Sequence, residues 1–341
     1  MASLEKPSLS TIPPEILEKI VENVDVKGRV SIQKCSKSLY THVSNANVTL
    51  PKAEFLIEKF QIYIPIHHEG VMRDYVTDYA VYSRHPIGCR VSVMKYRGGR
   101  PPKYVSTVSE KIVPGMDYLE RAISDFAAIF FTRRAKIENF TIDRFGWEES
   151  FDSTNIFNFF KKILSDRNNT IPVKEFVISL KGVTPEEALC IVPYLEPQYL
   201  NSISFFDPIV ESKWEEITSL SHWKEAKKIN FGISKVPVKE FVHCESIGLD
   251  LQNLTFADFQ LIIQSGMNPE KDNFHSFLTC NTVDPAIAPW LRTQRRFPEW
   301  SPYQIDKIIK VPNKNNHFLH VIHGTYHPPR PVSLILNRIV I

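Results

Sequence analysis

The stretch LSTIPPEILEKIVENVDVKGRVSIQKCSKSLY, residues 9–40, decides how the chain begins. Pro13 and Pro14 hold φ near the helical value, and a proline in a first turn gives up only an amide that has no helical partner. The negative charge of Glu15 favours the same helix N-terminus. These residues therefore predict that a helix starts at the pair of prolines.

The apolar side chains that follow repeat with the period of a helix. One stripe consists of Ile16, Leu17, Ile20, Val21 and Val24. Asp25 breaks this pattern and can cap a second helix, which carries Val26, Val30 and Ile32, and Ser36 can start a third, short helix. Since about forty residues cannot bury a core alone, we expect part of this apolar surface to need another segment or another protein.

The same residues resemble an F-box, whose pattern is Leu-Pro-x-Glu-Ile/Leu, a hydrophobic helix, and a second helix that ends in a small-basic-aromatic segment. Ile12 and Pro13 stand at the Leu-Pro position, although isoleucine replaces the usual leucine. Cys35 stands where valine is commoner, and Gly28 inside the second helix costs about 1 kcal/mol relative to alanine. The alternative is an N-terminal helical cap on the following domain.

An F-box resemblance implies docking on a Skp-family adaptor and, through it, on a cullin. The apolar and acidic positions expected to make this contact are Ile12, Pro13, Glu15, Ile16, Ile20, Val30 and Ile32.

The composition is that of an ordinary soluble globular protein, with 43% apolar and 23% charged residues. Lys+Arg 41 against Asp+Glu 38 gives a net charge of +3, which is too small to predict a nucleic-acid or membrane partner. Five cysteines without CxxC spacing favour a reducing compartment. The opening MASLEKPSLS has no apolar core of a secretory signal. We therefore expect an intracellular protein, cytoplasmic, nuclear or both.

Strands and helices alternate beyond residue 47. Residues 55–68 and 88–96 each predict one strand by alternation, and residues 97–103, RGGRPPK, predict a loop. Residues 115–134 and 152–167 predict helices with one apolar face.

A degenerate repeat of the form apolar-x-x-apolar-x-apolar then occupies residues 137–142, 173–180, 200–206, 226–233, 244–251 and 274–279. Its central residues Phe176, Ile203 and Ile229 are spaced by 27 and then 26 residues. This is the strand signature of leucine-rich-repeat-like units, and capping boxes at Thr184 and Thr255 start helices between the strands. The predicted fold is α+β or α/β: a three-helix F-box, then an irregular leucine-rich-repeat-like α/β solenoid whose parallel strands form a concave binding face.

This region also resembles the FTH domain, a companion of the F-box best known from a divergent nematode family. The resemblance rests on VKEFVISL, EEALCIVPYLEPQYLNSISF, SLSHWKEAKKINF, LDLQNLTFADFQLIIQ and the tail KVPNKNNHFLHVIHG…RPVSLILNRIVI. With the F-box it extends over residues 9–341. It predicts an F-box at 8–46, a connecting strand-and-helix region at 47–135 that forms the N-terminal part of the body, and an FTH-like repeat domain at 136–341.

Other clusters give no site. Three-residue steps alternate faces in a strand, so His317, His320, His323 and His327 are poorly spaced for zinc, whose ligands must converge. The basic residues at 95–103, and Arg292, Arg295 and Arg296 between Trp290 and Trp300, are expected in solvated loops. We find no GxSxG, HExxH, P-loop or dinucleotide motif, and expect no catalytic residue, metal or cofactor.

Three functions follow in order. The first is the substrate-receptor subunit of an SCF-type ubiquitin ligase, which binds an unidentified target protein through its FTH-like domain. The second is a non-degradative adaptor, for example one that joins an RNA-binding protein to other factors in translational control. The third, direct RNA binding through Arg97, Arg100 and Lys103, is last because the net charge is near zero.

Overall fold

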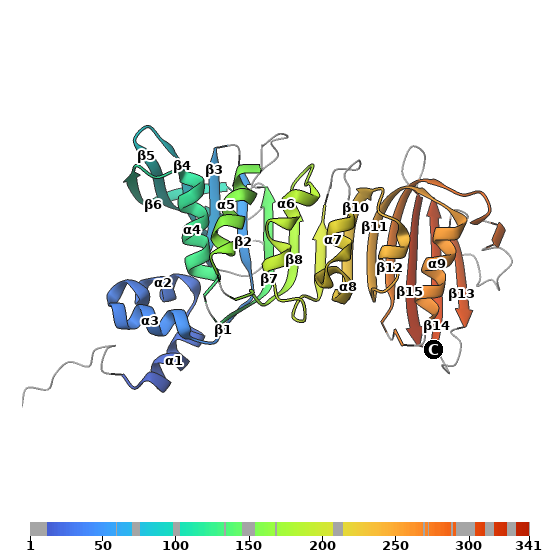
Figure 1. Cartoon of the computed structure of the whole chain (residues 1–341), viewed down its shortest axis with the longest axis horizontal. Helices are drawn as coiled ribbons and strands as arrows, with labels where there is room; N and C mark the ends of the chain where they lie inside the picture. Colours follow the sequence, from blue (N-terminus) through green and yellow to red (C-terminus); the bar gives the residue numbers. More distant parts are fainter. Residues whose placement is uncertain are drawn as a thin grey trace, which may run out of the picture. The chain divides into compact units, whose positions relative to one another are not determined.

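A computed structural model gives a mixed α/β chain with a large sheet (Figure 1). It describes residues 12–58, 60–69, 76–97, 103–132, 134–144, 154–167, 169–206, 214–268, 270–271, 273–287, 289–290, 304–310, 317–325 and 332–340. The chain divides into two compact units. Unit 1 comprises Met1–Val177 with Cys190–Tyr199, and unit 2 comprises Ile178–Leu189 with Leu200–Ile341.

Unit 1 begins with three short helices, as the sequence predicts: α1 (Pro14–Asn23), α2 (Val26–Cys35) and α3 (Lys37–Asn45). Pro14 is the first helical residue of α1. The carboxylate of Asp25 accepts a hydrogen bond of 2.7 Å from the amide of Gly28, which caps α2. The hydroxyl of Ser36 accepts one of 3.2 Å from the amide of Leu39, which caps α3. Both caps were predicted from the residue types.

The sheet of unit 1 is mostly an antiparallel meander. Strands β2 to β6 pair in chain order, and β7 pairs in parallel with both β1 and β2. The strands are β1 (Val48–Leu50), β2 (Ala53–Glu58), β3 (Gln61–Glu69), β4 (Val76–His85), β5 (Gly88–Arg97), β6 (Lys103–Pro114), β7 (Ala135–Arg144) and β8 (Val173–Ser179), the last of which belongs to unit 1 as far as Val177.

Two helices cover one face of this sheet, α4 (Tyr118–Phe130) and α5 (Thr154–Ser165) (Figure 1). Buried phenylalanines join them to β2, because the ring centroid of Phe55 lies 5.5 Å from that of Phe126 and 5.1 Å from that of Phe160. Both helices were predicted. The single strand predicted at residues 55–68 is wrong: β2 and β3 form an antiparallel hairpin in which Ile57 pairs with Ile62.

Unit 2 contains parallel strands in the order β9, β10, β11, β12, followed by the antiparallel strands β15, β14 and β13. The strands are β9 (Ser202–Phe205), β10 (Lys228–Ser234), β11 (Ser246–Leu254), β12 (His275–Val283), β13 (Gln304–Lys310), β14 (His317–Thr325) and β15 (Val332–Val340). Its helices are α6 (Pro185–Leu189), α7 (Glu215–Ser219), α8 (Ser221–Glu225) and α9 (Phe256–Met267).

The core of unit 2 is aromatic. The ring centroid of Phe231 on β10 lies 4.8 Å from that of Trp214, 5.7 Å from that of Trp223 and 5.9 Å from that of Phe205. All four side chains are buried. T-shaped and tilted aromatic contacts at these separations add to the free energy gained by burial.

The capping box predicted for α6 is confirmed, and Thr255 caps α9 as predicted. The amide of Thr184 donates to the carboxylate of Glu187 at 2.9 Å, and the amide of Glu187 donates to the hydroxyl of Thr184 at 3.1 Å. The hydroxyl of Thr255 likewise accepts from the amide of Asp258 at 3.1 Å. All six repeated segments overlap strands, and the last four pair in parallel. The solenoid as a whole stays a prediction, since β13 to β15 add antiparallel pairs.

No helix in the described part of the chain combines the length and the hydropathy needed to cross a membrane.

Candidate functional site

The predicted apolar stripe of α1 divides into two columns. Leu17 and Val21 are buried, with 2% and 0% of their surface exposed, and they form the inner core of the three helices together with Leu39 and Val43 of α3. Ile16 is 52% exposed. Ile20, one helical turn further along the same side, is half-buried. We call Ile16 and Ile20 the outer column of α1, because their own chain leaves them at the surface.

The other residues expected to dock lie around this column. Ile12 is half-buried, and Pro13 and Glu15 are exposed. On α2, which has no buried residue, Ile32 is half-buried. Tyr40 of α3, an aromatic residue that was not among the predicted docking residues, is 51% exposed. The sequence signal for its exposure is that Ser36 and Ser44, one helical turn before and after Tyr40, are polar.

Val30 has a different environment. With Val26, Arg29 and Gln33 it forms one face of α2, and this face lines a small pocket whose other wall includes Ile129 and Thr132. The pocket therefore lies between the three helices and the end of α4. Val30 faces the body of unit 1 across it.

An ion pair also holds α2 against the sheet of unit 1. Lys27 Nζ lies 2.9 Å from Oδ2 of Asp78 on β4, and Lys95 Nζ lies 3.8 Å from the other carboxylate oxygen. Only 3% of the Asp78 side chain is exposed. In the pocket beside α2, burial lowers the pKa of Arg29, and the nearby carboxylate of Asp25 opposes this shift. A buried carboxylate needs such partners because an unpaired charge is costly away from water.

The strands of unit 2 have one buried face and one more polar face. Ile203, Ile229 and Ile247 are adjacent in the register and buried. The next residue of each strand has the opposite orientation. We name these the polar row: Ser204, Asn230, Gly248 and, on β12, Phe277.

Two contacts order the polar row. The amide nitrogen of Asn230 donates to the hydroxyl of Ser204 at 3.0 Å. A Cβ at Gly248 would lie 2.3 Å from Oδ1 of Asn230, so any other residue there would require the Asn230 side chain to move. Phe277 is 42% exposed, and its pairing partner on β15 is the half-buried Ile335. The row thus joins hydrogen-bonding groups to one exposed aromatic ring.

The remaining clusters give no chemical site. Among the residues that the structure describes, no three His, Cys, Asp or Glu side chains are grouped to hold a metal ion. β14 contains His317, His320 and His323, while His327 lies outside the described residues, so it stays a prediction that these histidines form no zinc site. The arginines at 292, 295 and 296 and residues 98–102 also lie outside the described residues, so their place in solvated loops stays a prediction.

All five cysteines are free. Cys35 is exposed, and Cys89, Cys190, Cys244 and Cys280 are buried. Burial raises the pKa of the Cys89 thiol to about 11, and the pKa values of Cys244 and Cys280 to about 12. Since the thiolate is the reactive form, these three side chains act as small apolar groups.

Two known domain families match the parts of the chain that contain these surfaces. The F-box domain model matches residues 9–50, which include α1, α2 and α3. The FTH domain model matches residues 154–288, which include β9 to β12 and the polar row. Neither a curated protein nor a solved structure matches the chain. The chain is therefore an F-box protein with an FTH domain on the C-terminal side of its F-box.

Proposed function

We propose that this protein is the substrate-recognition subunit of an SCF-type ubiquitin ligase. F-box domains in general act as substrate adaptors of such ligases and bind adaptors of the Skp family. In this proposal the F-box binds a Skp-family adaptor and, through it, a cullin, while the FTH domain holds a target protein. The chain itself performs no chemistry and needs no cofactor. It works inside the cell, by raising the concentration of the target beside the ubiquitin-charged enzyme.

The observation that supports this proposal is the exposure of Ile16. Isoleucine on a helix is usually buried within its own domain. Here about half of the Ile16 side chain is exposed, while the adjacent Leu17 is buried. The helices of the F-box are therefore complete on the side of Leu17 and incomplete on the side of the outer column. Apolar anchors of this kind dominate the free energy of many protein interfaces.

In this proposal the seven predicted residues have two roles. Ile12, Pro13, Glu15, Ile16, Ile20 and Ile32 contact the adaptor. Val30 faces the body of unit 1, so its part is to hold α2 in position.

For the target, the proposed surface is the polar row with Phe277 at its end. Asn230 offers a half-buried hydrogen-bonding side chain that the buried Ser204 holds in place, and Phe277 offers an exposed apolar anchor. This proposal includes the domain boundaries 8–46, 47–135 and 136–341, and an irregular solenoid of leucine-rich-repeat type in the last of them.

Adaptor binding by the full-length protein tests the proposal. Ile16→Asp places a charge in the apolar contact, and we expect at least about 30-fold weaker binding of a Skp-family adaptor, since an interface anchor contributes about 2 kcal/mol or more. The matched control is Leu261→Asp on α9, where a 37% exposed aliphatic side chain receives the same charge. Calorimetry should give an unchanged affinity for the control. Equal affinity of Ile16→Asp and the natural protein contradicts the docking proposal.

Target abundance separates this function from that of a non-degradative adaptor. Removal of the protein from cells should raise the level of a bound target if the complex transfers ubiquitin. An unchanged level with intact target binding favours the adaptor, for example one in translational control.

A further inference from the structure

The strand β6 is an edge of the sheet in unit 1. It pairs with β5 on one side, and among the described residues no strand pairs with its other side. It lies between the two matched domains, whose ranges end at residue 50 and begin again at residue 154. An unpaired edge offers a row of backbone donors and acceptors to any extended chain.

Two bulges interrupt the pairing of β6 with β5. Val93 pairs with Ser109 and Met94 with Thr107, so Val108 has no opposite residue. In the same way Lys95 pairs with Ser106 and Tyr96 with Tyr104, which leaves Val105 unpaired. Bulges redirect side chains and are frequent at sheet edges and near functional sites.

The bulged valines point to solvent. Val108 is 56% exposed and Val105 48%, and Ile112 further along β6 is 38% exposed. Natural edge strands are usually protected by charged residues, proline or bulges. β6 has bulges and charged residues, yet it also exposes three aliphatic side chains. We call Tyr104, Val105, Val108 and Ile112 the β6 apolar row.

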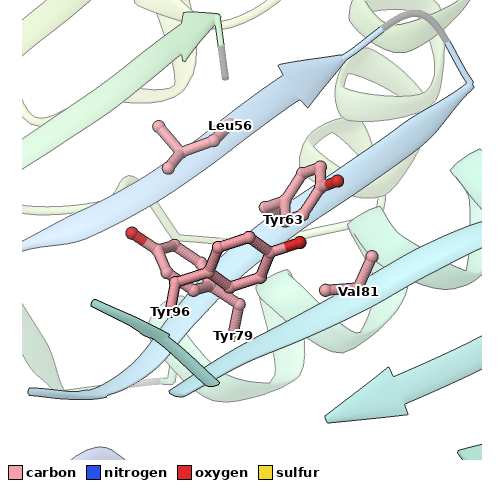
Figure 2. Close-up of a cluster of buried hydrophobic side chains, with 5 residues drawn as sticks. All are labelled: Leu56, Tyr63, Tyr79, Val81 and Tyr96. Carbon is pink, nitrogen blue, oxygen red and sulfur yellow. The ribbon is translucent and has the colours of Figure 1, made fainter. Parts of the chain in front are cut away.

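The first member of this row is fixed by an aromatic cluster. Tyr63, Tyr79 and Tyr96 are buried beside Leu56 and Val81 (Figure 2), and their rings meet edge to face with centroids 5.4 to 6.1 Å apart. The ring of Tyr104 continues this series at 5.8 Å from Tyr96, yet Tyr104 is 57% exposed. Because its neighbours are already ordered, Tyr104 would lose little conformational entropy on binding a partner.

The charges along the edge favour an acidic partner. Glu110 Oε1 lies 3.7 Å from Nε of Arg90 on β5, which balances its charge. Arg97 at the end of β5 and Lys111 on β6 are exposed, and no ion pair within the described residues neutralises either of them. An acidic side chain near Lys111 or Arg97 would complete this pattern.

We propose that the outer edge of β6 binds an extended segment of another protein, one that combines apolar and acidic residues. Its backbone pairs with the regular stretch from Ser109 to Val113, where the register with β5 has no bulge. Its apolar side chains contact the β6 apolar row, and an acidic side chain lies beside Lys111. This is addition of a strand to an exposed sheet edge.

Charge disfavours a second copy of this chain as the occupant. If the stretch Ser109–Val113 paired in register with the same stretch of a second copy, the two Lys111 side chains would lie directly opposite each other, and like charges at such positions are destabilising. A partner that carries an acidic residue at this position avoids the repulsion. The binding does not depend on the outer column of α1, so it can succeed or fail independently of adaptor docking.

A phage-displayed library of random peptides of about twelve residues provides the probe. Selection on the full-length protein should enrich acidic-apolar sequences, and the best peptide, made synthetically with a fluorophore, is then measured by anisotropy. We expect Val108→Glu to weaken its binding at least about tenfold, and Lys111→Glu to weaken it about threefold to tenfold. Both side chains are exposed, and unchanged thermal melting would show that the variants fold.

Two matched controls should bind the peptide normally. Lys161→Glu reverses an exposed lysine on α5, and Ile16→Asp charges an exposed isoleucine of the F-box. The proposal is overturned if no acidic-apolar peptide is enriched, or if Val108→Glu and Lys111→Glu bind the peptide as tightly as the natural protein. A dimer in light scattering that Val108→Glu dissociates would also overturn it, since a second copy would then occupy the edge.

Discussion

The F-box helices and the strands of the FTH domain bury their apolar residues in different ways. In the F-box, α1 and α3 each bury two residues and α2 buries none, while Ile16 and Tyr40 are about half exposed. In the FTH domain, Phe231 is surrounded by four other buried aromatic side chains. The first region depends on few internal contacts and leaves apolar surface uncovered, whereas the second encloses its own core.

This difference indicates which region supplies stability and which supplies a contact. A densely enclosed side chain contributes to stability through both transfer from water and the absence of a cavity. A half-exposed isoleucine contributes little to folding, but it can gain more surface burial when a partner binds. The predictions below test this division, starting with the largest effect.

Phe231→Ala should destabilise unit 2 by about 3–5 kcal/mol, because it leaves a cavity among buried aromatic rings. Urea unfolding followed by the fluorescence of the tryptophans would measure the loss. Phe277→Ala removes the same side chain from the exposed end of the polar row, and should cost less than about 1 kcal/mol. Comparable losses at both positions would contradict the division between core and surface.

Leu17→Ala and Ile16→Ala compare neighbouring residues of α1. We expect about 2–4 kcal/mol of lost stability for the buried leucine and about 0.5 kcal/mol for the exposed isoleucine. Hydrogen exchange at the amides of α1 and α3 reports this helix bundle without requiring the whole chain to unfold in one step. If Ile16→Ala accelerates exchange as strongly as Leu17→Ala does, then the outer column supports the fold and the docking proposal loses its main support.

Asp78→Ala tests the attachment of α2 to the body of unit 1. The variant removes a buried carboxylate that binds Lys27 at 2.9 Å, and a hydrogen bond to a charged group contributes about 1–3 kcal/mol. Faster hydrogen exchange in α2 would show the loosened contact. Glu120→Ala breaks the more exposed pair with Lys162 and should change stability by less than about 1 kcal/mol. An α2 unaffected by Asp78→Ala would mean that the pocket contacts alone hold it.

Thiol reactivity has the smallest energetic consequence. At pH 8 the thiolate fraction is about one in a thousand for a pKa of about 11, and about one in ten thousand for a pKa of about 12. A higher pH would raise these thiolate fractions, since pH 8 lies far below the pKa of each buried thiol. We expect one rapidly labelled thiol, Cys35, in a chromogenic disulfide assay of the folded protein. The fast phase should vanish in Cys35→Ser, and its persistence would show that a buried cysteine opens to solvent.

The features predicted correctly are local ones. The caps of Asp25, Ser36, Thr184 and Thr255 each join a side chain to an amide three residues away, so the residue types alone contain the information. The repeated segments of the FTH domain follow the period of a strand over six to eight residues.

The features missed depend on distant segments. β4 shows no alternation because residues 77–82 are buried on both faces, and the register of the β2–β3 hairpin depends on pairing across the turn. The sequence did not predict β6, because bulges that depend on the pairing with β5 change the orientation of its valines.

The sequence by itself therefore determined where the three helices begin, where the repeated strands lie, and that the first forty residues carry more apolar surface than they can bury alone. The tertiary structure decided which part of that surface stays open. Ile16 and Leu17 are adjacent aliphatic residues of one stripe, and only the positions of α3 and the neighbouring strands bury one and expose the other. The physical reason is that a cap is a contact within one turn of a helix, whereas burial is the sum of contacts with every segment that folds nearby.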